Sequence, residues 1–180
     1  AMVARRPDGL EPGAPLLEVA DTLAGMEALG RAARQRCDAR IVAVTGSVGK
    51  TGTKEALRMA LARDGATHAS EGNLNNHWGA PLSLARMPAD SRYGVFELGM
   101  SDAGEIEPLS RMVRPHVAII TNVEPVHLEF FASVAAIADA KAEIFLGLEP
   151  GGIAILNHDN QHYTRLRQMA EAVGAAVARI

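Results

Sequence analysis

One short segment, Thr45-Gly46-Ser47-Val48-Gly49-Lys50-Thr51, has the residue types of a phosphate-binding loop. The two glycines allow a tight turn in which backbone N–H groups point inward, and a following helix adds its positive N-terminal end. Lys50 supplies a mobile cation for the β- and γ-phosphates of ATP, and the Thr51 hydroxyl can bind the accompanying Mg²⁺. We therefore predict that the nucleotide contacts Gly46, Ser47, Val48, Gly49, Lys50, Thr51 and Gly52.

The loop is shorter than an ordinary Walker A motif, because two residues rather than four separate its first glycine from Gly49-Lys50. A tight strand-to-helix turn with a surface lysine would contain the same residues. The flanking sequence favours nucleotide binding, because the β-branched run 41–45 predicts a strand before the loop and the periodic stretch 53–63 predicts a helix after it.

The same alternation of strands and helices continues along the chain. Apolar runs predict further strands at 67–70, 93–98, 117–121 and 152–157, and helical periodicity predicts helices at 21–36, 81–86, 106–112, 134–146 and 162–173. This alternation predicts an α/β fold: a three-layer, P-loop-type (Rossmann-like), mostly parallel sheet with helices on both faces. Ligands of such sheets bind at the carboxyl ends of the strands.

Length and composition limit the possible functions. A chain of 180 residues with 48% hydrophobic residues suits one compact domain, which we place at 16–180 after a Pro- and Gly-rich linker or tail at 1–15. A net charge of -3 without a basic block argues against nucleic acid as a partner. The single cysteine cannot form an internal disulfide, and neither a secretory signal nor an apolar run long enough to span a membrane is expected, so a cytoplasmic protein is predicted.

Four residues outside the loop could take part in phosphate chemistry. Glu97 ends an apolar strand, where a carboxylate could hold Mg²⁺ directly or through water, although a solvated acid is the alternative. Asn122 follows the next strand, where it could equally be a turn residue. His127 lies in the adjoining loop, and loop histidines are usually solvated. Lys141 lies on a long helix, where a lysine is normally solvated and its ammonium would be repelled by a metal ion.

The shortened loop, with Thr45 before it and Lys54 after it, resembles the Mur ligase family, whose members use ATP to join amino acids or peptides to the peptidoglycan precursor. Residues 72–84, which begin Gly-Asn-Leu-Asn-Asn, are similar to the members that add D-alanyl-D-alanine. Segments 97–101, 121–129 and 140–145 match in the same order, so that the resemblance covers roughly residues 16–160. Gly52 departs from the family, which usually has a hydroxyl residue there.

The resemblance implies a function and a set of ligands. The γ-phosphate of ATP would pass to the carboxylate of a UDP-linked muramoyl tripeptide, and D-alanyl-D-alanine would attack the resulting acyl phosphate. Family members have three domains, and this chain would be the central ATPase of a bacterial enzyme, with adenine contacts in the carboxyl-terminal domain. Without its flanking domains the fragment is expected to be inactive in amide formation.

The resemblance also assigns roles to individual residues. Glu97 would hold one Mg²⁺, and His127 would hold a second. Lys141 would be carbamylated, which turns its amine into an oxygen ligand for the metal. The resemblance thus makes Lys50, Glu97, His127 and Lys141 the catalytic set, and Thr51, Glu97, His127 and carbamylated Lys141 the metal ligands. Asn122 would lie near the phosphates. Asn73, Asn75 and Asn76 could contact substrate or fix a turn, and the resemblance favours a role near the substrate.

Two alternatives remain open from the sequence. The chain could be a nucleotide-binding module without activity of its own, which would form no ADP even with substrate and Mg²⁺. It could also belong to another Mur ligase or to a folylpolyglutamate synthase-like ligase. Residues 72–84 argue against these relatives.

Overall fold

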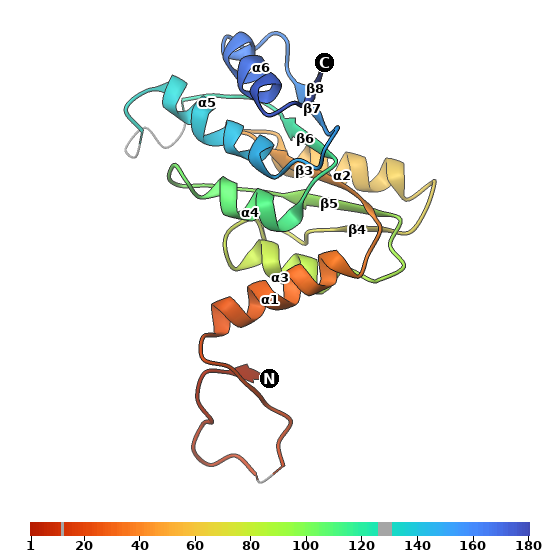
Figure 1. Ribbon diagram of the computed structural model, residues 1–180, viewed down its shortest axis with the longest axis vertical. Coiled ribbons are helices and arrows are strands. Elements are labelled where there is room, and N and C mark those ends of the chain that lie inside the picture. The colour runs from red at the N-terminus through yellow and green to blue at the C-terminus, as the bar shows by residue number, and fades with distance from the viewer. Residues whose placement is uncertain (12, 126–130) are drawn as a thin grey trace.

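The computed structural model describes residues 1–11, 13–125 and 131–180. Its centre is a six-stranded sheet in the order β4-β5-β3-β6-β7-β8, and every neighbouring pair is parallel (Figure 1). The strands are β3 (Arg40–Thr45), β4 (Thr67–Ala69), β5 (Tyr93–Glu97), β6 (Val117–Ile120), β7 (Ile153–Leu156) and β8 (Ala176–Arg179). The predicted parallel α/β sheet is confirmed.

Helices cover both faces of the sheet, but unequally. They are α1 (Thr22–Gln35), α2 (Lys50–Leu61), α3 (Gly79–Ala85), α4 (Ile106–Val113), α5 (Val134–Ala142), the 3₁₀ turn η1 (Glu143–Gly147) and α6 (Tyr163–Ala172). Alternate residues of β3 face opposite ways, because strand side chains have a period of two. Ile41 and Ala43 join the large core beneath α3, α4, α5 and α6, whereas Val44 packs with Leu57 and Leu61 of α2 on the other face.

Local capping sets the starts of two helices. The Asp21 side chain accepts a hydrogen bond from Ala24 N (2.7 Å) at the start of α1, and Ser133 accepts one from Ala136 N (3.1 Å) at the start of α5. The predicted helix 134–146 is α5 continued by η1, so the α-helix itself is shorter than expected. Among the helices of the described residues, none has the length and apolar character needed to cross a membrane.

Two features of the fold were not predicted. Strand β8 completes the sheet at its edge, although its alanine-rich sequence carries little of the β-branched pattern that marks a strand. The segment predicted as a linker contains β1 (Met2–Val3), which pairs in parallel with β2 (Leu17–Glu18). The termini lie at opposite ends of the molecule in Figure 1.

Candidate phosphate and metal site

The predicted phosphate loop connects the end of β3 to the start of α2. Gly46 has a φ of 151° and Gly49 a φ of 86°, so both adopt backbone conformations that favour glycine. A Cβ atom on Gly46 would also overlap the Thr121 hydroxyl, so only glycine fits at this position. Lys50 Nζ donates to Gly46 O at 2.8 Å, and so its charge lies over the loop.

The carboxyl end of β6 holds the loop from the other side. Ser47 N donates to Asn122 O (2.9 Å), while Ser47 Oγ donates to Glu124 O (3.1 Å) and accepts from Glu124 N (2.9 Å). The Thr121 hydroxyl donates to Val48 O at 2.6 Å. In this structure Ser47 therefore anchors the loop to the segment after β6. The Val48 side chain is exposed, and there is open space around Gly52.

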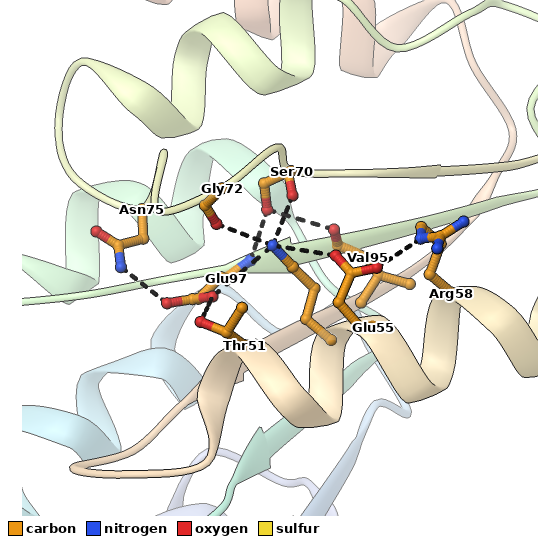
Figure 2. Close-up of polar contacts among 9 residues, drawn as sticks. Thr51, Glu55, Arg58, Ser70, Gly72, Asn75, Val95 and Glu97 are labelled. Atoms are coloured by element: carbon orange, nitrogen blue, oxygen red, sulfur yellow. Dashed lines mark hydrogen bonds and ion pairs between the residues drawn. The ribbon is translucent and has the colours of Figure 1, made fainter.

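Two predicted magnesium ligands, 46 residues apart in the sequence, are in direct contact. Thr51 Oγ1 donates to Glu97 Oε2 at 2.9 Å, and Asn75 Nδ2 donates to Glu97 Oε1 at 2.8 Å (Figure 2). Glu97 is 2% exposed, and Ser70 Oγ accepts a hydrogen bond from its backbone N–H (2.9 Å). A hydroxyl beside a carboxylate suits Mg²⁺, which takes few protein oxygens and keeps water and phosphate as its other ligands.

Lys141 reaches the same site from α5, on the other face of the sheet from α2. It is 3% exposed, and burial together with the positive charge of Lys50 lowers its pKa to about 8. The two lysines line one pocket of about 290 Å³ with eight other residues, which are Gly46, Ser47, Asn75, Asn76, Gly99, Met100, Ser101 and Glu105. Three parts of the site that were predicted separately are therefore brought together: the phosphate loop, the asparagine segment (residues 72–76) and Lys141.

The three predicted substrate-binding asparagines have different positions. Asn75 and Asn76 line the pocket, whereas Asn73 is not among its lining residues and accepts Asn75 N through its backbone carbonyl (2.7 Å). Asn76 Oδ1 accepts hydrogen bonds from Trp78 N (3.1 Å) and Gly79 N (2.9 Å), so it caps the start of α3.

Asn122 lies at the end of β6 and lines a second pocket of about 390 Å³. Its side chain donates to Glu124 Oε1 (2.7 Å) and accepts from Asn160. His127, the predicted ligand of a second magnesium, lies outside the described residues. Within the described part of the chain, no group of three or more His, Cys, Asp or Glu side chains could hold a metal ion.

Several residues that shape the site were given no role from the sequence. Lys54 is 0% exposed beside Glu97, and Ser101 and Glu105 line the pocket. Glu143 accepts hydrogen bonds from Gly104 N, Ile106 N and Glu107 N (2.6–3.2 Å) at the start of α4. Helical periodicity gave no signal for Lys54 or Glu143, because a charged residue on a helix normally faces solvent.

Residues 44–180 match the Mur ligase middle domain family. The UDP-N-acetylmuramoyl-tripeptide–D-alanyl-D-alanine ligase of Rickettsia prowazekii is 46% identical over 133 residues, which are 74% of this chain and 30% of that protein. The ligase of the same name from Escherichia coli K12 is 42% identical over 163 residues, covering 91% of this chain and 36% of that protein. The chain thus spans about a third of the length of these relatives.

Solved structures give the same result. A crystal structure of MurF from Acinetobacter baumannii superposes with a TM-score of 0.88 at 35% identity, covering 99% of this chain and 38% of that one. MurF from Thermotoga maritima in complex with ADP gives a TM-score of 0.83 at 28% identity, with coverage of 99% and 40%. Escherichia coli FolC in complex with DHPP and ADP shares the fold at 17% identity (TM-score 0.66, coverage 86% and 46%). Together with the family match over residues 44–180, these similarities show that the chain belongs to the Mur ligase middle domain family.

Proposed function

We propose that this chain is the central ATPase domain, at residues 16–180, of an enzyme that adds D-alanyl-D-alanine to a UDP-linked muramoyl tripeptide in the bacterial cytoplasm. The observation that carries the proposal is the contact between Thr51 and Glu97, whose carboxylate also bonds Asn75, a residue that lines one pocket with Lys50 and Lys141. The names of the relatives at 46% and 42% identity support this choice of substrates.

The chemistry that this geometry suits is transfer of the γ-phosphate of ATP to a carboxylate. Lys50 and the loop N–H groups would hold the phosphates, and Thr51 and Glu97 would hold the Mg²⁺ that neutralises their charge. The tripeptide carboxylate attacks the γ-phosphorus and ADP leaves. The amine of D-alanyl-D-alanine then attacks the acyl carbon, and phosphate leaves as the amide forms. Both steps depend chiefly on positioning and charge, which a preformed pocket supplies.

Asn75 and Asn76 are proposed to lie next to the carboxylate substrate, because they line the same pocket as Gly46, Ser47 and Lys50 of the loop. Asn73 is kept as a more distant member of the same segment. Asn122 is proposed to approach the phosphates from the end of β6, and His127 to bind a second Mg²⁺. The flanking domains of the full-length enzyme would supply the uridine-nucleotide contacts, the adenine contacts and closure over ATP.

Lys141 is proposed to carry a carbamate. Its Nζ lone pair would bond to the carbon of CO₂, and the nitrogen would lose a proton. This reaction needs a neutral amine, which a pKa of about 8 makes available near neutral pH. The carbamate would replace a cation beside Lys50 with an anion, which removes the repulsion between the two lysines and provides an oxygen ligand for Mg²⁺.

The function can be tested by ADP formation in the full-length enzyme that contains this chain. We expect ADP release to require both the UDP-linked muramoyl tripeptide and D-alanyl-D-alanine, and to fall about 1,000-fold in Glu97→Gln, because a metal ligand is lost. A preference for a single amino acid would reject the substrate assignment. Nucleotide binding without ADP release would favour a binding module.

The carbamate can be tested in the 180-residue chain, because its sequence contains three lysines, Lys50, Lys54 and Lys141. With ¹³C-bicarbonate, NMR should show a carbamate carbon that is lost in Lys141→Arg and kept in Lys50→Arg. Intact mass measured without acid gives a second readout. The α-amino group of Ala1 can form a carbamate of its own, whose signal persists in every variant. If the parent chain shows no carbamate signal that disappears in Lys141→Arg, the modification is ruled out.

A further inference from the structure

Lys54 is a charged residue that the proposed chemistry leaves without a role. Its side chain is fully buried, at 0% exposure, on the first turns of α2. Lys50, on the same helix, bonds Gly46 O of the phosphate loop, whereas Lys54 bonds carbonyls just after β4. A lysine is rarely buried unless acceptors surround it, so this position requires an explanation.

The surroundings of Lys54 supply such acceptors. Lys54 Nζ donates to Ser70 O at 2.8 Å and to Gly72 O at 2.9 Å. It lies 3.4 Å from Glu55 Oε1 and 4.0 Å from Glu97 Oε2. Figure 2 shows the Ser70 and Gly72 carbonyls converging on one point, with Glu97 and Glu55 beside it. An ammonium has three donors in a compact head, which matches this arrangement.

These contacts connect three parts of the site. The Ser70 and Gly72 carbonyls belong to the segment that leads from β4 to Asn75, and Asn75 bonds Glu97 Oε1. Ser70 Oγ also accepts the Glu97 backbone N–H. Through one side chain, α2 therefore holds both the asparagine segment and the carboxylate that the hydroxyl of Thr51 contacts.

We infer that Lys54 is a positioning residue, which keeps the Glu97 carboxylate and the Gly72–Asn76 segment in register with the phosphate loop for Mg²⁺ binding. The inference rests on the proposed function, because Glu97 is a magnesium ligand in that proposal. Lys54 Nζ itself lies 4.0 Å from Glu97 Oε2, and Lys54 does not line the pocket. Residues that orient a metal ligand act through that ligand and affect metal affinity more than the folded fraction.

The test is ADP formation by the full-length enzyme as free Mg²⁺ is varied at saturating substrates. In Lys54→Met we expect the half-saturating Mg²⁺ concentration to rise about 10- to 100-fold, the range typical of residues that orient a metal ligand. A residue that merely supported the fold would reduce the active fraction, which lowers kcat and leaves the Mg²⁺ half-saturation unchanged. An unchanged Mg²⁺ half-saturation in Lys54→Met would overturn the inference.

Arg58→Met is the matched control. Arg58 is on the same helix one turn further on, pairs with the same Glu55 at 2.7 Å, and is solvent-exposed. Its removal takes away a cation from the neighbourhood without touching Glu97, so we expect both kcat and the Mg²⁺ half-saturation to stay within about twofold of the parent. A shift as large as that of Lys54→Met would assign the effect to general charge and overturn the inference.

Two further measurements keep the test decisive. Lys54→Gln keeps an N–H donor on a side chain one bond shorter and should give a smaller shift than Lys54→Met. Failure of both variants to fold would make Lys54 a core residue and overturn the positioning inference. If the parent enzyme forms no ADP, the proposed function fails separately. The contact between Lys54 and the Gly72–Asn76 segment is then tested through Trp78, the single tryptophan of the 180-residue chain. Its fluorescence anisotropy should fall in Lys54→Met as the Gly72–Asn76 segment becomes more mobile. Unchanged anisotropy would overturn it.

Discussion

Two buried lysines lie on opposite sides of the phosphate loop in contrasting environments. Lys54, on the α2 side, has two carbonyl oxygens within 2.9 Å of its Nζ and two carboxylates within 4.0 Å. Lys141, on the α5 side, has Lys50 as the charged neighbour that perturbs it, and its pKa is lowered to about 8. Both side chains are almost fully excluded from solvent.

The difference shows how one residue type can serve two purposes within a single site. Acceptors around Lys54 compensate the cost of burying an ammonium, and so its charge can serve as a structural tie. Around Lys141, burial and a like charge favour the neutral amine, which is the nucleophilic form. The environment, not the residue type, separates a structural cation from a candidate for chemical modification.

The largest expected effect tests the Lys54 side of this comparison. Replacing Lys54 with Met should lower the free energy of unfolding of the 180-residue chain by about 3–5 kcal/mol, because Glu97 then loses its buried partner. Urea denaturation at pH 7 measures this. Arg58→Met, which removes an exposed ion pair, should change the free energy by about 0.5 kcal/mol or less. A loss below about 1 kcal/mol for Lys54→Met would contradict the contrast drawn between the environments of Lys54 and Lys141.

The second effect is a dependence of the free energy of unfolding on pH, which is caused by Lys141. Its folded pKa is about 8, below the ordinary value of 10.5, so between these values the unfolded chain binds more protons and stability rises with pH. The protonated, buried Lys141 destabilises the folded chain by about 3 kcal/mol, from the size of the pKa shift. This destabilisation is fully present below pH 8 and disappears towards pH 10.5. Lys141→Met should therefore be more stable than the parent at pH 7 and equal to it near pH 10.5.

Urea denaturation of both proteins from pH 7 to 10.5, in buffer free of CO₂, measures this difference. Comparing the two proteins removes the titrations that they share. The expected sign at pH 7 is opposite to that of Lys54→Met, although each variant replaces a buried lysine by the same residue. If Lys141→Met were as destabilising as Lys54→Met, the two environments would be equivalent and the comparison would fail.

A third effect concerns how the Lys141 side is held in place. Glu143, two residues after Lys141, accepts three backbone N–H groups at the start of α4, where that helix has no side-chain cap of its own. Glu143→Ala should lower the free energy of unfolding by about 2 kcal/mol, because these donors lose a charged acceptor at a helix N-terminus. Thermal or urea unfolding checks it. Glu143→Gln keeps an acceptor and should recover part of the loss; a Gln variant no better than Ala would assign the effect to the charge alone.

The smallest effect tests the connection between the phosphate loop and the end of β6. Ser47→Ala removes the paired hydrogen bonds with the Glu124 backbone and should cost about 1 kcal/mol. Val48→Ala is the neighbouring control, and its exposed side chain should contribute about 0.5 kcal/mol or less. Hydrogen exchange should also rise at Val123 and Glu124 in Ser47→Ala. Protection unchanged at these residues would show that the Ser47 hydroxyl is not needed to hold the loop against the end of β6.

Much of the architecture could be predicted from the sequence. The run 41–45 and the glycines that follow it predict a strand, a phosphate loop and a helix, and the structure has β3, the loop and α2 there. Strand β8 could not be predicted, because pairing with β7 decides its conformation more than the preferences of its alanines. The boundary at residue 16 and the roles assigned to the site residues stay predictions.

By itself, the sequence determined the residue types of the site, because a glycine turn, a lysine and a hydroxyl are local requirements for holding phosphate. The tertiary structure alone decided that Thr51 contacts Glu97 and that Asn75 contacts the same carboxylate, because parallel pairing brings the ends of β3, β4 and β5 to one edge. It also decided the different environments of Lys54 and Lys141. Helical periodicity describes each lysine as a polar residue on a helix, whereas the atoms that surround it after folding set its charge and its role.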